Sequence, residues 1–558
     1  MNAFRRLGVI AATAAIVILS MSAQAQPDTV FHHAIVYSVD DAFSVAEAIA
    51  VRDGRIQRVG SSAKILELAG PDTKRVDLNG KTVVPGLIDS HGHLLGLGQS
   101  LQNLNLVGTE SFDEIVALVS DRVADASSGE WITGRGWDQN DWIDARMPVH
   151  ETLSACSPDN PVMLRRIGGH ASLVNAAALA IAGIDRETQD PPGGKIMRDA
   201  KGEATGVLID TAQGLVDGNV PSATQEQTRE AVKLAIEHCL SLGLTSVHDA
   251  GIPPSLVDLY KSMIDADEFN LRVYAMLSGR SARSLRAEFV RGPLIGYGVG
   301  RLTVRCIKVV GDGALGSRGA ALLESYSDDP GNTGLLIVDE DRMTEMTVAA
   351  IRAGFQVATH AIGDRTNHIT LNAFESAMKA VPETSDARLR IEHAQIIALD
   401  DLPRFAALGI IPSMQATHAT SDLPWAPKRL GADRIRGAYA WRKLMDTGVR
   451  IANGSDFPVE NANPMWGIYA AVTRQDRDGM PEDAWQPDQR MTREEALRSF
   501  TIDAAYAAFE EEEKGSIERG KWADFVVLDR DIMNVPPLEI LNARVEMTVL
   551  GGDAVYER

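Results

Sequence analysis

The chain has 558 residues, 45% hydrophobic and 23% charged, a composition typical of a soluble globular protein with one large domain and smaller appendages. Its net charge of −21 argues against nucleic acid as a partner and disfavours adhesion to anionic lipid, because phosphate groups bind basic surfaces. We therefore expect a small-molecule substrate and no nucleic acid. Three scattered cysteines predict no disulfide framework.

The first 25 residues have the composition of a signal peptide. Arg5 and Arg6 precede an apolar stretch that ends at Met21, and Ala23-Gln24-Ala25 supplies small residues for cleavage. A membrane anchor is the alternative, but the stretch is short for a span of about 20 residues. We expect residues 1–25 to be removed and the mature chain to be exported, to the periplasm in a cell with two membranes, without stable membrane association.

Both ends of the mature chain predict β-structure. "TVFHHAIVYSV" and the rest of residues 26–84 alternate apolar and polar side chains between turn signals. Residues 511–558, with "GKWADFVVLDRD", repeat this pattern. Two β-rich ends around a different middle predict one small sheet domain assembled from both termini.

Residues 85–510 alternate helical patterns with short apolar strands, which predicts a (β/α) barrel or an open parallel sheet. "DRMTEMTVAAIRAG", for example, leads into "FQVATHAIGD". A late helix is expected to begin at Thr492, with Glu495 completing a capping box. Residues 100–230 fit the alternation poorly, and we interpret them as an insertion after the first barrel strand.

Histidines and other polar residues follow several of the predicted strands. In a barrel the carboxyl ends of the strands converge at one rim, and imidazole and carboxylate groups suit zinc and its neighbours. His91 and His93 can share one metal ion because residues i and i+2 of a strand point to the same face. The five candidates are His91, His93, His360, His393 and Asp456, and Lys308 stands at another of the predicted strand ends.

Simpler explanations exist for parts of this pattern. A single histidine at a strand end is usually a hydrogen-bonded core or surface residue, but four strand ends of one array are harder to explain in that way. Residues 311–316 spell GxGxxG, yet they lie inside the barrel-like series and open no Rossmann βαβ unit. A metal site is therefore favoured over a dinucleotide site.

The motifs resemble a known family. "VVPGLIDSHGHL", "THAIGD", "IEHAQ", "NGSDFP" and "KGSIERGKWADFVVLD" resemble the amidohydrolase superfamily. "GRGWDQNDW", "GGHASLVNAAAL", "GLTSVHDAG" and "IKVVGDGALGSRGAAL" resemble its N-substituted formamide deformylase-like branch. The resemblance implies an α/β fold: a distorted TIM (β/α)8 barrel with a composite β-sandwich from both termini and an inserted cap segment.

The resemblance also implies roles for individual residues. His91, His93, His360 and His393 match metal-ligating histidines, and Asp456 matches the aspartate that binds metal and acts as general base and acid. Lys308 stands where a lysine carboxylated by carbon dioxide bridges two metals; the alternative is a lysine paired with Asp312. One or two divalent ions are expected, with zinc favoured.

Five further residues are candidates for substrate contact. Trp137 and His170 lie in the insertion, where a substrate-facing wall is expected, although each could be structural. His248 ends another barrel strand and could line the pocket or orient a ligand. Arg318 could hold a substrate carboxylate or carbonyl, or fix its own loop, and His418 could face substrate.

These features predict a metal-dependent hydrolase that cleaves an amide-type C–N bond of a small N-substituted amide or N-acyl compound. The same site could instead act on a cyclic amide, a carbamate or a lactone, or deaminate a ring. A non-catalytic periplasmic metal- or ligand-binding protein is disfavoured by the intact ligand set. A homodimer is the base-rate expectation for a soluble homo-oligomer.

Overall fold

A parallel barrel forms the centre of the molecule. The computed structural model describes residues 26–558 except 167–168, 170, 280 and 384–385, so the expected signal peptide lies outside the described residues. Eight parallel strands follow one another around a single path. They are β8 (Leu87–Gly92), β15 (Leu244–Ile252), β16 (Arg272–Ser278), β18 (Leu302–Val310), β19 (Gln356–Ala361), β20 (Arg390–His393), β21 (Ile411–Gln415) and β22 (Ala452–Gly454).

The first and last strands of this path are joined by polar contacts. The Ser455 hydroxyl donates to Asp89 at 2.6 Å, and the backbone N–H of Asp456 donates to the carbonyl of His91 at 2.7 Å. These bonds hold Ser455 and Asp456, which follow β22, beside β8. The sheet is therefore a nearly closed barrel, which confirms the expected TIM-like fold and excludes an open sheet.

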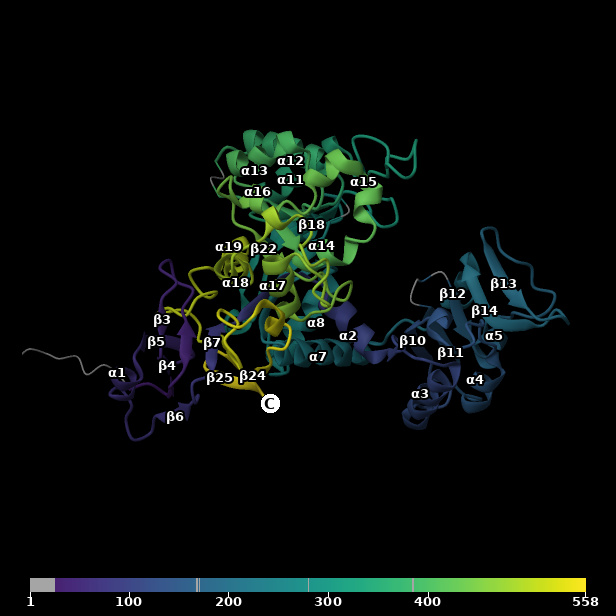
Figure 1. Ribbon diagram of the computed structural model, residues 1–558, viewed down its shortest axis with the longest axis horizontal. Helices are drawn as coiled ribbons and strands as arrows, with labels where there is room; N and C mark the ends of the chain where they lie inside the picture. Colours follow the sequence, from purple (N-terminus) through teal and green to yellow (C-terminus); the bar gives the residue numbers. More distant parts are fainter. Residues whose placement is uncertain (1–25, 167–168, 170, 280, 384–385) are drawn as a thin grey trace, which may run out of the picture.

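Helices cover the outside of the barrel (Figure 1). The principal ones are α2 (Leu94–Gln102), α7 (Gln225–Ser241), α8 (Pro254–Asp265), α11 (Glu340–Arg352), α12 (Asp364–Ala380), α13 (Leu402–Leu408), α14 (Ala416–Asp422), α15 (Ala426–Arg434), α16 (Trp441–Met445), α17 (Pro464–Thr473), α18 (Arg493–Ser499) and α19 (Ile502–Ala507). Helix α18 begins with the expected capping box of Thr492 and Glu495. Among the described residues, no helix combines the length and apolar character needed to cross a membrane.

Two further sheets pack together beside the barrel. One has the order β5-β4-β1-β6, and the other, β25-β24-β23-β7-β2-β3, combines strands from both ends of the chain. Their strands are β1 (Thr29–His32), β2 (Ile35–Tyr37), β3 (Val45–Ala46), β4 (Ala48–Arg52), β5 (Arg55–Gly60), β6 (Lys74–Asp77), β7 (Thr82–Pro85), β23 (Phe525–Leu528), β24 (Val545–Leu550) and β25 (Asp553–Glu557). Apolar side chains of both sheets, such as Phe31, Ile49 and Phe525, form one buried cluster, as in a sandwich.

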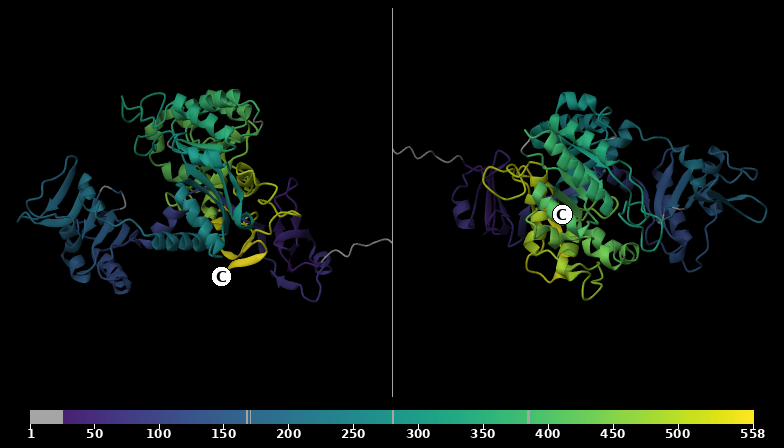
Figure 2. Two further views of the ribbon diagram at one scale, coloured as in Figure 1. Left: turned by 180° about the vertical axis from the view of Figure 1, so that it is seen from behind. Right: turned by 90° about the horizontal axis from the view of Figure 1, so that it is seen from above.

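The segment between β8 and β15 contains a third sheet, of order β13-β14-β12-β11-β10-β9. Its elements are β9 (Leu104–Asn105), α3 (Phe112–Asp125), β10 (Ile132–Trp137), α4 (His150–Cys156), β11 (Val162–Arg166), β12 (Ala171–Val174), α5 (Ala176–Ile181), β13 (Gly194–Arg198), β14 (Ala204–Asp210) and α6 (Gly214–Asp217). The segment has its own buried core. It projects beyond α2 and α7, with the barrel between it and the terminal sheets (Figures 1 and 2).

Candidate functional site

A pocket of about 700 Å³ opens where the barrel strands end. His91, His93, Lys308, His360, His393 and Asp456 all line it. The other lining residues are Ala250, Gly251, Ser278, Gly279, Val310, Ile337, Val338, Arg342 and Val459. Every lining residue comes from a barrel strand or from a segment that follows one, and the described part of the insertion contributes none.

Ligand atoms at the first strand of the barrel, β8, lie close to Asp456, which follows the last strand, β22. Its Oδ1 lies 3.1 Å from Nε2 of His93 and 3.7 Å from Nε2 of His91. Both histidines thus turn one ring nitrogen toward the same carboxylate, as the HxH spacing predicts. A Cβ on Gly92 would lie 2.4 Å from the Phe457 ring, so the close neighbour of this glycine is an aromatic side chain and not the backbone or metal considered from the sequence.

Three histidines present Nε2 to the pocket because oxygen atoms engage their Nδ1. Nδ1 of His93 lies 2.9 Å from the carbonyl oxygen of Ala250, and Nδ1 of His393 lies 2.7 Å from Oε1 of Gln415. Nδ1 of His91 contacts the carboxylate of Glu392. Since each acceptor is an oxygen, the ring donates N–H from Nδ1, and Nε2 is the nitrogen that faces the pocket. This arrangement supports metal-binding histidines in proteins.

Behind His91 lies a buried ion pair that was missed in the sequence analysis. Arg390 and Glu392 are both fully buried, and Nε of Arg390 donates to Glu392 Oε1 at 2.8 Å. Burial alone would raise the pKa of Glu392, but Arg390 and His91 outweigh it and hold the carboxyl pKa below its ordinary value. The sequence does contain an indication of this pair, because two charged residues at positions i and i+2 of a buried strand share one face and need partners.

Lys308 points at the same centre. Its buried Nζ lies 3.0 Å from Nε2 of His91, and burial lowers the pKa of this amine. Asp312, the alternative partner, instead accepts hydrogen bonds from the backbone N–H groups of Ala321, Ile362 and Gly363. Asp312 therefore fixes loops around the pocket, while Lys308 lies among the histidines.

The opposite side of Asp456 faces two more histidines. Nε2 of His418 lies 3.8 Å from Asp456 Oδ2, and the His418 ring stacks on His393 with centroids 6.0 Å apart. The His360 ring contacts His393 at 4.5 Å, but its nitrogen atoms are not among the ligand atoms that lie within 4.8 Å of one another. Among the described residues, two such groups share Asp456: one with His91 and His93, the other with His393 and His418.

The donor chemistry fits a divalent metal ion. Burial lowers the pKa of His91 to about 4 and lowers that of His393 well below its usual range, so both rings are neutral at pH 7. Burial would raise the pKa of Asp456, but the hydrogen bond from His93 and the neighbouring histidines keep it below its ordinary value. The buried Nε2 atoms of His360 and His418 have no hydrogen-bond partner among the described residues. The neutral imidazoles of His91 and His393 and the ionised carboxylate of Asp456 are typical ligands for a zinc-type ion.

Two of these residues also have left-handed backbone conformations. The φ angle is +70° at His393 and +60° at Asp456. Such angles are uncommon for residues other than glycine, and they occur often where a site fixes the direction of a side chain. Both residues follow or end a barrel strand, so the turn re-aims each side chain into the pocket.

The remaining candidates lie in different surroundings. Trp137 is fully buried in the core of the insertion, where its Nε1 donates to the carbonyl of Leu164 at 2.8 Å. Arg318 forms an ion pair with Asp328 at 3.0 Å, within its own loop region. His248 is fully buried, and its Nδ1 accepts from Arg390 at 3.0 Å, so it lies behind the pocket lining. His170 lies outside the described residues.

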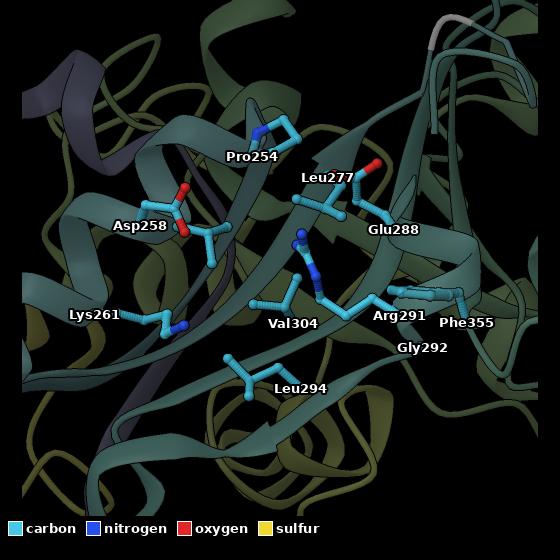
Figure 3. A pocket seen from close by; sticks show the side chains of 11 residues that line it. Pro254, Asp258, Lys261, Leu277, Glu288, Arg291, Gly292, Leu294, Val304 and Phe355 are labelled. Carbon is cyan, nitrogen blue, oxygen red and sulfur yellow. The ribbon is translucent and has the colours of Figure 1, made fainter. Parts of the chain in front are cut away.

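A smaller pocket, of about 270 Å³, lies on the outer side of the barrel (Figure 3). Leu277 and Val304 of strands β16 and β18 form its floor, and Asp258, Lys261 and Arg291 also line it. The segment between these strands carries only the short helix α9 (Arg286–Arg291) and strand β17 (Leu294–Gly296) before α10 (Tyr297–Gly300), which leaves this face partly uncovered. The two pockets share no lining residue.

Comparisons with known proteins agree with this geometry. Residues 74–556 match the model of the amidohydrolase family. The chain is 36% identical over 544 residues to protein LONG AFTER FAR-RED 3 of Arabidopsis thaliana, covering 95% of this chain and 91% of that protein. It is 28% identical over 544 residues to the N-substituted formamide deformylase of Arthrobacter pascens, covering 95% of this chain and 98% of that protein.

A solved structure extends the likeness to three dimensions. An uncharacterized metal-dependent hydrolase from Pyrococcus furiosus superposes with a TM-score of 0.75 at 29% identity, covering 91% of this chain and 100% of that one. The family match spans most of the chain and includes every residue of the histidine pocket. The expected resemblance is confirmed: the chain belongs to the amidohydrolase family, as a metal-dependent hydrolase acting on carbon–nitrogen bonds.

Proposed function

We propose that the protein hydrolyses the amide C–N bond of a small N-substituted amide or N-acyl compound, with Asp456 as general base and acid. The convergence of His91, His93 and Asp456 within 3.1–3.7 Å, beside Lys308 and His393, carries this proposal. The similarity to an N-substituted formamide deformylase supports the substrate class. The apolar wall of Val310, Ile337, Val338 and Val459 would suit an apolar substituent.

Each group has a task in this reaction. A bound divalent ion, with zinc favoured, supplies Lewis acidity that activates water and stabilises charge developing on a carbonyl oxygen. His91 and His93 would hold it through Nε2, and Asp456 through Oδ1. The ionised Asp456 carboxylate accepts a proton from the attacking water and returns it to the leaving nitrogen. Nε2 of His418, 3.8 Å from Asp456 Oδ2, is available to hydrogen-bond the substrate.

Lys308 is proposed to carry a carboxyl group derived from carbon dioxide and to bridge two ions. Its buried Nζ lies 3.0 Å from Nε2 of His91, where a plain ammonium would repel a dication. Carboxylation would replace that positive charge with a negative oxygen donor. A centre with carboxylated Lys308 would hold two ions, and a centre without the carboxyl group would hold one.

The test is a panel of N-substituted formamides and N-acyl compounds, with cyclic amides, carbamates, lactones and aminated rings as competing substrates. We expect the first group to be hydrolysed with the highest kcat/KM. Activity should rise with an apparent pKa near neutrality and disappear with a chelator. Preference for a competing class would reject the substrate assignment. Metal binding without any turnover would indicate a binding protein.

We also propose that the mature chain is exported, most simply to the periplasm. The basic, apolar and small-residue order of residues 1–25 supports this proposal. N-terminal sequencing of the protein from a periplasmic fraction should begin at Gln26, and an intact Met1 would contradict export. A homodimer remains the expectation from base rates.

A further inference from the structure

A third group of ligand atoms lies far from the barrel pocket. Within the described residues, His32, His33 and Asp77 form the one group of metal-type ligands that does not include Asp456. Their side chains lie where strands β1 and β6 end, and the parallel register pairs His32 with Asp77. Neither the family motifs nor the proposed reaction uses these residues.

The backbone places the two adjacent histidines on the same side. Neighbouring residues of a strand normally point to opposite faces. His33 instead has a φ of +55°, and the ring centroids of His32 and His33 are 4.6 Å apart. The N–H of His33 donates to Ser62 Oγ at 2.9 Å, and its carbonyl accepts from the N–H of Gly80. This conformation is therefore fixed by bonds at both ends of the residue.

The three ligand atoms surround a space of the right size for an ion. Nδ1 of His33 lies 3.1 Å from Nδ1 of His32 and 3.0 Å from Asp77 Oδ2, and the third separation is 4.0 Å. Zinc–ligand bonds of about 2.0–2.1 Å in a tetrahedron place ligand atoms about 3.3 Å apart. Two of the measured separations, 3.0 and 3.1 Å, are slightly shorter than this value, and the third, 4.0 Å, is longer.

Hydrogen bonding alone satisfies this group poorly. An imidazole nitrogen has a single in-plane hydrogen or lone pair, yet Nδ1 of His33 has two partners. The other oxygen of Asp77 accepts from the N–H of Asn79 at 2.9 Å, which keeps Oδ2 turned toward the histidines. The side chains of His33 and Asp77 are 55% and 46% exposed, so an ion can enter from solvent.

We propose that His32, His33 and Asp77 form a second, surface metal site for a divalent ion of the zinc, nickel or copper type. Two imidazoles and one carboxylate bind such ions with water in the remaining positions. The ion would link the end of β1 to the end of β6, outside the catalytic centre. The proposal does not depend on the proposed function.

The test counts zinc equivalents bound by metal-free protein, titrated in competition with a chromophoric chelator. His33→Asn removes the central ligand and keeps a residue type that tolerates a positive φ. Asp77→Asn removes the charge and keeps the shape. We expect each variant to bind one zinc fewer per chain than the wild type, with unchanged amidase activity after reloading.

His368→Gln is the matched control. His368 also has a carboxylate partner, Asp401 at 2.9 Å, but among the described residues it belongs to no group of three ligands. This variant should bind as many equivalents as the wild type. Equal stoichiometry in the wild type and His33→Asn would overturn the site. Because the result is a difference between variants, it holds even if the barrel pocket binds no metal.

Discussion

Glu392 connects the buried core of the barrel to the ligand His91, and Glu392→Gln tests this connection. The variant keeps the shape of the side chain but leaves the fully buried guanidinium of Arg390 without its carboxylate partner. Removing one partner of a buried ion pair costs about 3–5 kcal/mol of unfolding free energy. Loss of the hydrogen-bond partner of a metal-binding histidine lowers metal affinity by about 10–100-fold, or about 1.4–2.7 kcal/mol.

Two measurements separate these effects: chemical denaturation of the metal-free protein, and metal affinity by chelator competition. Asp524→Asn is the control, because Asp524 pairs with the buried Arg272 at 2.9 Å and lies outside the pocket lining. The control should lose comparable stability and keep its metal affinity. If Glu392→Gln loses stability but binds metal like the wild type, Glu392 does not orient His91 and our reasoning fails. Unchanged stability would refute the ion-pair argument.

Three other substitutions address separate parts of the account. Asp456→Asn should keep most of the metal but lower kcat by about 10²–10⁴-fold, because an amide cannot accept the proton, and near-wild-type kinetics would exclude Asp456 as the base. Lys308→Met should reduce the metal content by one ion per chain in elemental analysis; an unchanged content would assign Lys308 a structural role. Partial burial raises the pKa of Asp503 to about 6, above the value of about 3.9 in an unfolded chain, so its charge begins to destabilise the fold above about pH 4 and does so fully above about pH 6. Asp503→Asn should therefore raise the unfolding free energy by up to about 3 kcal/mol at pH 7, and an equal gain at pH 4 in denaturation curves would contradict this cause.

The barrel and the convergence of its strand ends could be predicted because both depend on local periodicity. Helix and strand patterns alternate along the chain, and parallel strands bring their carboxyl ends to one rim. His91, His93, Lys308, His360, His393 and Asp456 accordingly line one pocket. The closure of the barrel through Asp89 and Ser455 depends on residues far apart in the chain, so no local pattern indicates it.

Features that depend on tertiary packing were harder to predict. Trp137 lies in a glycine-rich stretch typical of a loop, yet its ring fills the core of the insertion. The direction of a side chain within a folded insertion is decided by neighbours distant in sequence. Glu392 stands directly before the ligand histidine His393, whose motif gives the stronger signal, although a carboxylate inside a buried strand requires a partner. Nothing in the sequence indicates that His32 and His33 could bind one ion together, because only the positive φ of His33 places both rings on one side.

The central claim is that the barrel pocket holds metal, and elemental analysis tests it most directly. The measurement should use the mature His33→Asn variant, so that the surface site contributes nothing. We predict two divalent ions per chain, lost together with amidase activity on chelation and restored by zinc. No tightly held metal, even after zinc is added back, would contradict the assignment of His91, His93 and Asp456 as a metal centre.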